Sequence, residues 1–256
     1  MPLSAVILEQ SPPPPPAVLI DLLQRQGIPK PVAQKLARQS GEIVWEHAEA
    51  EPAAALAGAL SNCGHPARVV SQADVPPVTR PRRVPRLDLD EPRLGIFVGY
   101  GDEPVWFAWE QVLVLSAGVF KSEKIESRAE EVRNVEGMLV GMERRVKVEL
   151  ERRIVADLFA DEGTELRHFR LQSHELNYSQ TMGGTALQSW REKFTLVLAR
   201  LALRSAQALI SPQTEALLAA GLIAADCQVD PYFEDDERFA AHNRWLVLRH
   251  RLGLAG

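Results

Sequence analysis

The chain has 256 residues, of which 46% are hydrophobic and 25% are charged, close to the composition of an average soluble globular protein. This composition does not require disorder of the whole chain and offers ample apolar material for a core, and the length predicts one large domain or two smaller ones. The formal net charge of −5 argues against a general electrostatic attraction to nucleic acid or to an anionic membrane.

Cysteine usage and hydropathy favour a cytoplasmic protein. Cys63 and Cys227 lie far apart and share no C-x-x-C pattern, so a disulfide scaffold is not expected and a reducing compartment is favoured. We expect Cys63, which ends an alanine-rich helix, to be a buried or half-buried cysteine without a reactive thiolate. The opening MPLSAVILEQ lacks the basic start of a signal peptide, and no segment offers the roughly 20 apolar residues that span a bilayer.

Residues 1–75 predict a small α+β domain. Apolar periodicity and helix-ending glycines give the order strand, helix, helix, strand, helix, strand. The corresponding ranges are 5–10, 17–26, 31–39, 41–48, 52–63 and 67–75. Five prolines at 12–16 precede the first helix. They could dock a proline-binding partner, but a stiff connector into the helix is favoured, because proline suits the first helical turn.

Two stretches in this domain, GIPKPVAQKLA at 27–37 and ALAGALSNCGHPARVVSQ at 55–72, resemble the C-terminal domain of the bacterial ribosomal stalk protein. The same small fold is used by the adaptor that delivers N-degron substrates to a bacterial protease. In the stalk family, lysines after the turn glycine contact translation factors. The corresponding positions here hold Pro31 and Gln34, and Lys30 and Lys35 are displaced by one residue. The resemblance therefore implies a docking module whose partner is not the one known for the stalk.

Residues 76–93 are rich in proline and arginine and show no apolar periodicity, which predicts a solvated linker. The segment also holds a basic cluster that could contact phosphate groups: Arg80, Arg82, Arg83 and Arg86. This cluster leaves open an RNA- or ribosome-associated factor. The linker is favoured because acidic residues follow at once and no aromatic residues are interleaved for base stacking.

Residues 94–256 predict antiparallel strands followed by helices. A hairpin is expected around 101–104, and a second over 146–179 with its turn at Asp161-Glu162-Gly163. A long amphipathic helix is expected over 186–209, and a last helix over 232–251. A further helix should begin at Ser211-Pro212 and end at Gly221. Residues 121–145 give no assignment.

The phrase FAWEQVLVL at 107–115, followed by strands and a long helix, resembles a bacterial pleckstrin-homology-like barrel over residues 94–210. In that family a helix covers one open end of the barrel. Such domains bind lipids, peptides or other proteins and rarely carry catalytic groups. The resemblance therefore implies a second interaction module.

Aromatic residues at 105–109 raise the question of a ligand platform. Strand alternation places Val105, Phe107 and Trp109 on one uniformly apolar face, which predicts that they belong to the core under the long helix. Trp106 shares the opposite face with Glu110. It is therefore the one ring that we expect to be exposed and the one candidate for ligand contact.

Known catalytic and metal-binding patterns are missing from the sequence. There is no H-E-x-x-H, no zinc-spaced Cys/His pair, no G-x-S-x-G and no phosphate-binding glycine loop. His168 and His174 would lie roughly 20 Å apart along a strand. His242 and His250 would lie about 12 Å apart along a helix, so neither pair should share an ion. The sequence therefore predicts no metal and no cofactor, and it assigns no catalytic residue.

The leading hypothesis is a non-enzymatic, two-module interaction or adaptor protein of α+β class that binds another protein. One alternative is an enzyme whose site is assembled from scattered residues, with His168, His174 and Glu175 as candidates. The other is the RNA- or ribosome-associated factor. The sequence identifies neither the partner, nor the ligand-binding residues, nor the oligomeric state.

Overall fold

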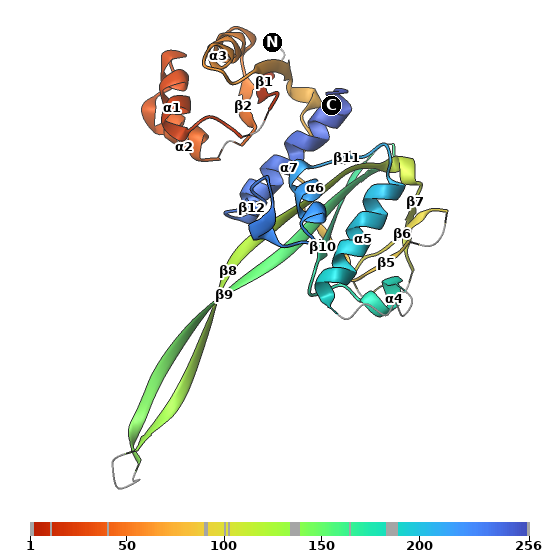
Figure 1. Cartoon of the computed structure of the whole chain (residues 1–256). Helices are drawn as coiled ribbons and strands as arrows, with labels where there is room; N and C mark the ends of the chain where they lie inside the picture. Colours follow the sequence, from red (N-terminus) through yellow and green to blue (C-terminus); the bar gives the residue numbers. More distant parts are fainter. Residues whose placement is uncertain are drawn as a thin grey trace.

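The computed structural model describes residues 3–10, 12–39, 41–89, 92–99, 101, 103–133, 139–163, 165–182 and 189–254. Its helices and its antiparallel and mixed sheets place the protein in the α+β class, as expected. Figure 1 shows a small N-terminal module, a larger sheet body with helices on both faces, and a long two-stranded ribbon that projects from the body.

The N-terminal module has the order of elements expected from the sequence. It comprises β1 (Ser4–Leu8), α1 (Pro16–Arg25), α2 (Lys30–Gln39), β2 (Ile43–Ala48), α3 (Ala50–Asn62) and β3 (Ala67–Ser71). The sheet order is β2-β1-β3, with β1 antiparallel to both neighbours. One face of β1, with Val6 and Leu8, packs on α1, α2 and α3. Leu19, Leu23 and Leu56 are among its fully buried side chains.

The expectation of a solvated linker at 76–93 is wrong for the described part of that segment. β4 (Arg82–Arg83) pairs in parallel with β10 (Leu166–Gln172). β5 (Arg86–Asp88) joins β6 (Leu94–Phe97) and β7 (Val105–Phe107) in an antiparallel sheet. The buried residues Val84, Leu87 and Leu89 hold the segment in the main core. These few apolar side chains hold the segment against the body. The sequence did not indicate this, because proline and arginine dominate its composition.

The body is built on β8 (Val112–Arg133) and β9 (Leu139–Asp161), paired antiparallel along almost their whole length. The sheet order is β11-β8-β9-β10-β4, with β11 (Leu209–Ile210) parallel to β8. β12 (Tyr232–Phe233) also pairs in parallel with β8, beside Val119 and Phe120. The predicted β9–β10 hairpin is confirmed: Gly163 has a φ of +89° and its N–H donates to the Asp161 carboxylate at 2.7 Å.

The barrel expected over 94–210 is not formed. In the described part of the chain the strands make open sheets, which helices cover on two faces. α5 (Trp190–Arg204) packs on one face through Phe194, Val197, Leu198 and Leu201. This helix is shorter than the predicted 186–209, because the chain leaves it after Arg204 to form β11. Residues 183–188 lie outside the described residues. Short helices α4 (Tyr178–Met182) and α6 (Pro212–Ala219) complete this layer.

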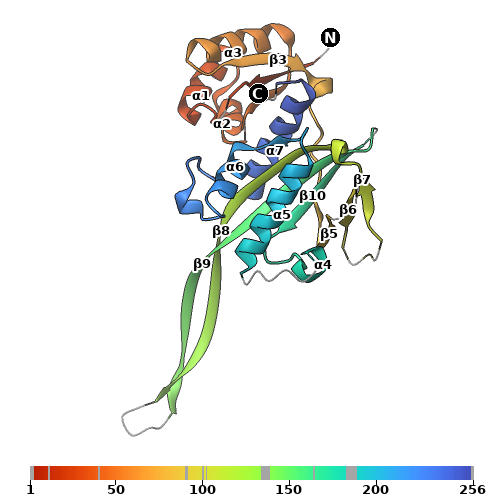
Figure 2. The same cartoon turned by 45° about the vertical axis from the view of Figure 1, so that its right-hand side comes forward.

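The last helix, α7 (Asp236–Arg251), lies between the body and the N-terminal module (Figure 2). Its side chains Trp245 and Leu248 share a core with Ala5 and Ile7 of β1 and with Phe159 of the body. β1 therefore has one face against the module's own helices and the other against α7. Because of this shared core, the two predicted modules form one continuous packed unit.

Candidate functional site

A fully buried carboxylate, Asp157, organises a polar network between the sheet and α7. Arg170 donates to it through two nitrogens, at 2.7 and 2.8 Å, and the His168 imidazole lies 2.8 Å from the same carboxylate. The amide of Asn243 on α7 donates at 2.9 Å. Arg170 reaches on to Asp236, at the start of α7, at 2.7 Å. The network thus fastens α7 to the sheet.

The charges of this network stabilise one another. Burial alone would raise the pKa of Asp157, but hydrogen bonds and charge attraction from Arg170 and His168 outweigh it and lower that pKa. Burial likewise opposes the charge on Arg170, yet Asp157 and Asp236 raise its pKa overall. Because the carboxylate accepts hydrogen bonds from three side chains and is not exposed to solvent, its geometry is that of a structural anchor.

The three candidate residues of the enzyme alternative have separate partners. His168 is buried, stacks on Phe159 at 4.2 Å and has its second ring nitrogen 3.2 Å from Thr79. The His174 ring lies 4.6 Å from that of Trp190. Glu175 pairs with Arg83 at 3.6 Å. No contact among the described residues brings the three together into one site.

The aromatic residues and the arginine that the sequence singled out pack against other side chains of the protein. Phe107 and Trp109 are buried in the core that contacts α5, as predicted. Trp106 is half-buried rather than exposed, because its ring lies across Gly95, where an added Cβ would come within 2.9 Å of it. Arg86 lies over the Phe97 ring at 3.5 Å, so this member of the basic cluster packs on an aromatic side chain.

The two cysteines differ in exposure. Cys63 is exposed at the C-cap of α3, where it was expected to be buried or half-buried. Desolvation and the neighbouring carboxylates of Asp226 and Asp230 raise the pKa of the Cys227 thiol.

Within the described ranges, no group of three or more His, Cys, Asp or Glu side chains could hold a metal ion. No helix described in the structure is long and apolar enough to cross a membrane.

The β8–β9 ribbon is the first of two features that sequence reasoning missed, in this case in part, because the strand from Val146 was predicted but residues 121–145 were left unassigned. β11 and β12 cover the outer edge of β8 as far as Phe120, and β10 covers that of β9 from Val155 onward. From Lys121 to Arg133, β8 pairs only with β9 among the described residues. At about 3.3 Å per residue this ribbon extends roughly 40 Å. Alternation of Val146, Val148 and Leu150 with charged residues was the available signal.

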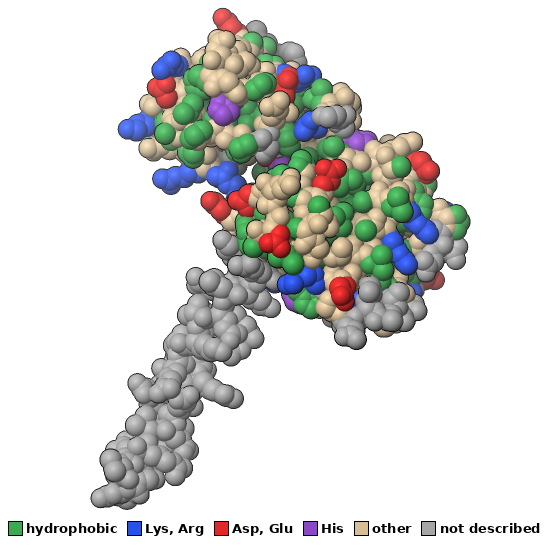
Figure 3. Space-filling model, viewed as in Figure 1, with side chains coloured by type: hydrophobic (Ala, Val, Ile, Leu, Met, Phe, Trp, Pro, Cys, Tyr) green, Lys and Arg blue, Asp and Glu red, His purple; other side chains and the backbone are tan. Residues whose placement is uncertain are grey.

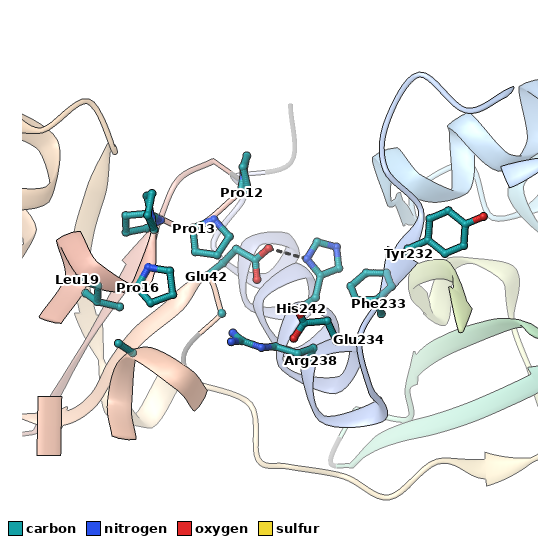
Figure 4. Close-up of a pocket in the computed structure, with 14 residues that line it drawn as sticks. Pro12, Pro13, Pro16, Leu19, Glu42, Tyr232, Phe233, Glu234, Arg238 and His242 are labelled. Carbon is teal, nitrogen blue, oxygen red and sulfur yellow. Dashed lines mark hydrogen bonds and ion pairs between the residues drawn. The ribbon is translucent and has the colours of Figure 1, made fainter. Parts of the chain in front are cut away.

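The second missed feature is the junction pocket, a pocket of about 480 Å³ where the N-terminal module meets α7 (Figure 4). The prolines at 12–16 form one wall and Phe233 of β12 part of the other. His242 of α7 and Glu42 lie between them, joined by a 2.8 Å hydrogen bond across 200 residues of sequence. No local pattern links two residues so far apart, and the sequence therefore gave no signal for this pair.

Comparison of the chain with protein-family models, with curated proteins and with solved structures found no match. Function must therefore be argued from the geometry of this chain alone. The ribbon and the junction pocket are the two features that the packing of the body does not require.

Proposed function

We propose that the protein is a non-enzymatic interaction or adaptor protein, and that the β8–β9 ribbon is the arm that holds its protein partner. The observation that carries the proposal is that the ribbon beyond Phe120 has neither a third strand nor a covering element among the described residues. An isolated two-stranded ribbon is at best marginally stable in water. A partner that covers one face supplies the missing stabilisation.

The register gives the ribbon two unlike faces. Ile125 lies opposite Val148, whereas Lys124 lies opposite Glu149. Because neighbouring positions of a strand belong to opposite faces, these two pairs mark different faces. The face of Ile125 holds the apolar positions Ala129, Met142, Val146, Val148 and Leu150, interrupted by Glu123, Glu131 and Arg144. The other face holds charged residues of both signs, among them Lys124, Glu126, Arg128, Lys147 and Glu149.

This pattern supports a protein as the occupant. The apolar face offers a stripe for hydrophobic burial. The outer edges of the ribbon, which pair with no further strand in the described part of the chain, offer backbone groups for an added strand. The mixed-sign charged face keeps the free arm soluble and disfavours pairing on the wrong side. Lys121 and Arg152, an opposed pair on the apolar face, separate the stripe from the body's own core.

The position of the N-terminal module also supports the ribbon as the surface that binds the partner. Its element order agrees with the resemblance to the stalk C-terminal domain, and we propose that it is a docking module of that kind. The sheet face that its helices leave free is already covered by α7. The module thus docks within its own chain, and the ribbon is left as the surface for a second protein.

The test is affinity capture from native lysate with three variants of the full chain. In the first, residues 124–149 are replaced by Asn-Gly, which joins the opposed residues Glu123 and Leu150 by a two-residue turn. The second is I125K/V148E on the apolar face. The third, K124E/E149K, swaps a charge pair on the other face and serves as the matched control.

We expect the first two variants to lose the partner that the wild type captures, with at least a tenfold fall in affinity, about 1.4 kcal/mol or more. The charge swap should keep it, because both composition and pairing are preserved. Retention of the same partner by the shortened chain would refute the arm, and so would the absence of any enriched protein. Binding of the wild type to lipid vesicles alone would assign the arm to a membrane instead.

A further inference from the structure

His242 is a buried histidine with one nitrogen left over. The residue is 3% exposed and lies on α7 where the helix faces the N-terminal module. Its Nδ1 lies 2.8 Å from the Glu42 carboxylate. Its Nε2 is buried and has no hydrogen-bond partner among the described residues. Figure 4 shows this second nitrogen on the side of the ring that faces away from Glu42.

The hydrogen bond to Glu42 sets the tautomer of the neutral His242 ring. A carboxylate only accepts hydrogen bonds, so the Nδ1 of the neutral ring carries the hydrogen and donates it to Glu42. The Nε2 of that tautomer then holds a lone pair and accepts. A buried acceptor that no donor satisfies destabilises the folded protein. A ligand that donates to Nε2 removes that cost, and this gives the pocket a built-in preference for donors.

The remaining walls define the body of the ligand. The proline rings at 12–16, Leu19 and Phe233 form an apolar lining in which saturated and aromatic rings predominate. Phe233 stands 5.5 Å from the His242 ring, so an aromatic surface adjoins the acceptor. The volume of about 480 Å³ lies within the range of small-molecule pockets. These walls fit a planar aromatic body.

The charges of the lining select against anions. Glu42 and Glu234 contribute two carboxylates against the single guanidinium of Arg238. Figure 3 shows acidic and basic side chains close together at this waist between the module and the body. A carboxylate or phosphate would therefore meet a net negative lining, whereas an uncharged hydroxyl or N–H group would not.

We propose that the junction pocket binds a small uncharged aromatic molecule that carries a hydroxyl or N–H group, which donates to Nε2 of His242. The same chemistry is offered by a free phenol and by the tyrosine side chain of a peptide. The site stands apart from the ribbon, so the variant that lacks residues 124–149 keeps it.

The decisive test compares p-cresol with 4-methylanisole, which has nearly the same shape but no donor. Binding is followed on the full chain through the ¹⁵N chemical shift of His242 Nε2, up to about 5 mM probe. We expect p-cresol to move that resonance upfield and to bind at least about tenfold more tightly than 4-methylanisole. Equal affinity of the two probes, or no binding of either, would overturn the proposal.

Two variants test whether the preference for p-cresol depends on His242. His242→Gln should abolish the preference for p-cresol, whereas His250→Gln, on the same helix but bonded to the Gln207 carbonyl, should keep it. A preference that survives His242→Gln contradicts the proposal. Should His242→Gln fail to fold, the two probes on the wild type still decide. N-acetyltyrosinamide separates the sources: tighter binding than p-cresol indicates a tyrosine of a peptide, and weaker binding a free small molecule.

Discussion

At Asp157, hydrogen bonds from Arg170, His168 and Asn243 replace the water that the carboxylate loses on burial. Direct cross-strand pairing sets up the most important of these contacts, since Asp157 on β9 lies opposite Arg170 on β10. The side chains that donate to Asp157 come from β10 and α7, so the contacts join different elements. The folded body therefore depends strongly on a single buried carboxylate, that of Asp157.

Asp157→Asn should destabilise the protein by about 3–5 kcal/mol at neutral pH, because it leaves the buried Arg170 without its main counter-charge. The folded-state pKa of Asp157 is lowered, so the stability that this group contributes is fully present above the unfolded value of about 3.9. It is lost as pH falls through the lower folded pKa. Urea denaturation at pH 7 and at successively lower pH measures both quantities.

The gap between wild type and Asp157→Asn should narrow in acid, where the wild-type carboxylate is protonated too. A gap that stays constant down to the pH of acid unfolding would show that the charge of Asp157 contributes nothing. The contacts of His168 show why the sequence could not reveal the network around Asp157. Its proximity to His174 was visible, but its actual partners, Asp157 and Thr79, are set by strand pairing and by a segment 89 residues away.

At the scale of elements, periodicity predicted most of what the structure contains. The six elements of the N-terminal module and the β9–β10 hairpin have strong apolar patterns and clear turns. β4 and β5 were missed because strands of two and three residues are too short for any period to show. The outer ribbon was predicted only in part: the alternation from Val146 onward indicated a strand, whereas residues 121–145 were left unassigned because they are mainly charged.

β12 is held against β8 by a close approach at Gly118. A Cβ added at this position would lie 2.6 Å from the Phe233 ring and 3.2 Å from that of Phe239. Gly118→Ala should therefore displace β12 and destabilise the protein by about 1–3 kcal/mol. Thermal denaturation measures the loss, and p-cresol titration should show a weakened junction pocket, because Phe233 lines it.

Gly58→Ala is the matched control for Gly118→Ala. Gly58 lies within α3 with nothing within 4 Å of an added Cβ, and alanine is favoured over glycine there by up to about 1 kcal/mol. The control should thus be neutral or stabilising. A Gly118→Ala variant as stable as this control would mean that β12 does not depend on that close approach.

The whole molecule depends on α7, which contributes to two interfaces at once. On one side it contacts the sheet through the Asp157 network, and on the other it contacts β1 and β2 of the module. Arg244 holds Glu46 of β2 through two hydrogen bonds of 2.9 Å. The sequence predicted the helix but could not predict its place, because that place is decided by residues about 200 positions away.

Trp245 is the side chain on which this arrangement most depends. It is 2% exposed, and its indole N–H donates to the Leu8 carbonyl of β1 at 2.7 Å. Since module and body share this core, the wild type should unfold in a single calorimetric transition. Trp245→Ala should cost about 3–5 kcal/mol and split unfolding into two transitions, as the module loses its contact with α7.

Trp190→Ala serves as the comparison, because this half-buried tryptophan at the start of α5 lies outside the shared core. It should lower stability by less and leave one transition. Two transitions already in the wild type would show that the modules fold independently despite the shared core. Equal effects of the two substitutions would show instead that Trp245 acts only through general packing. Coupling through α7 requires that Trp245→Ala alone separates the module from the body.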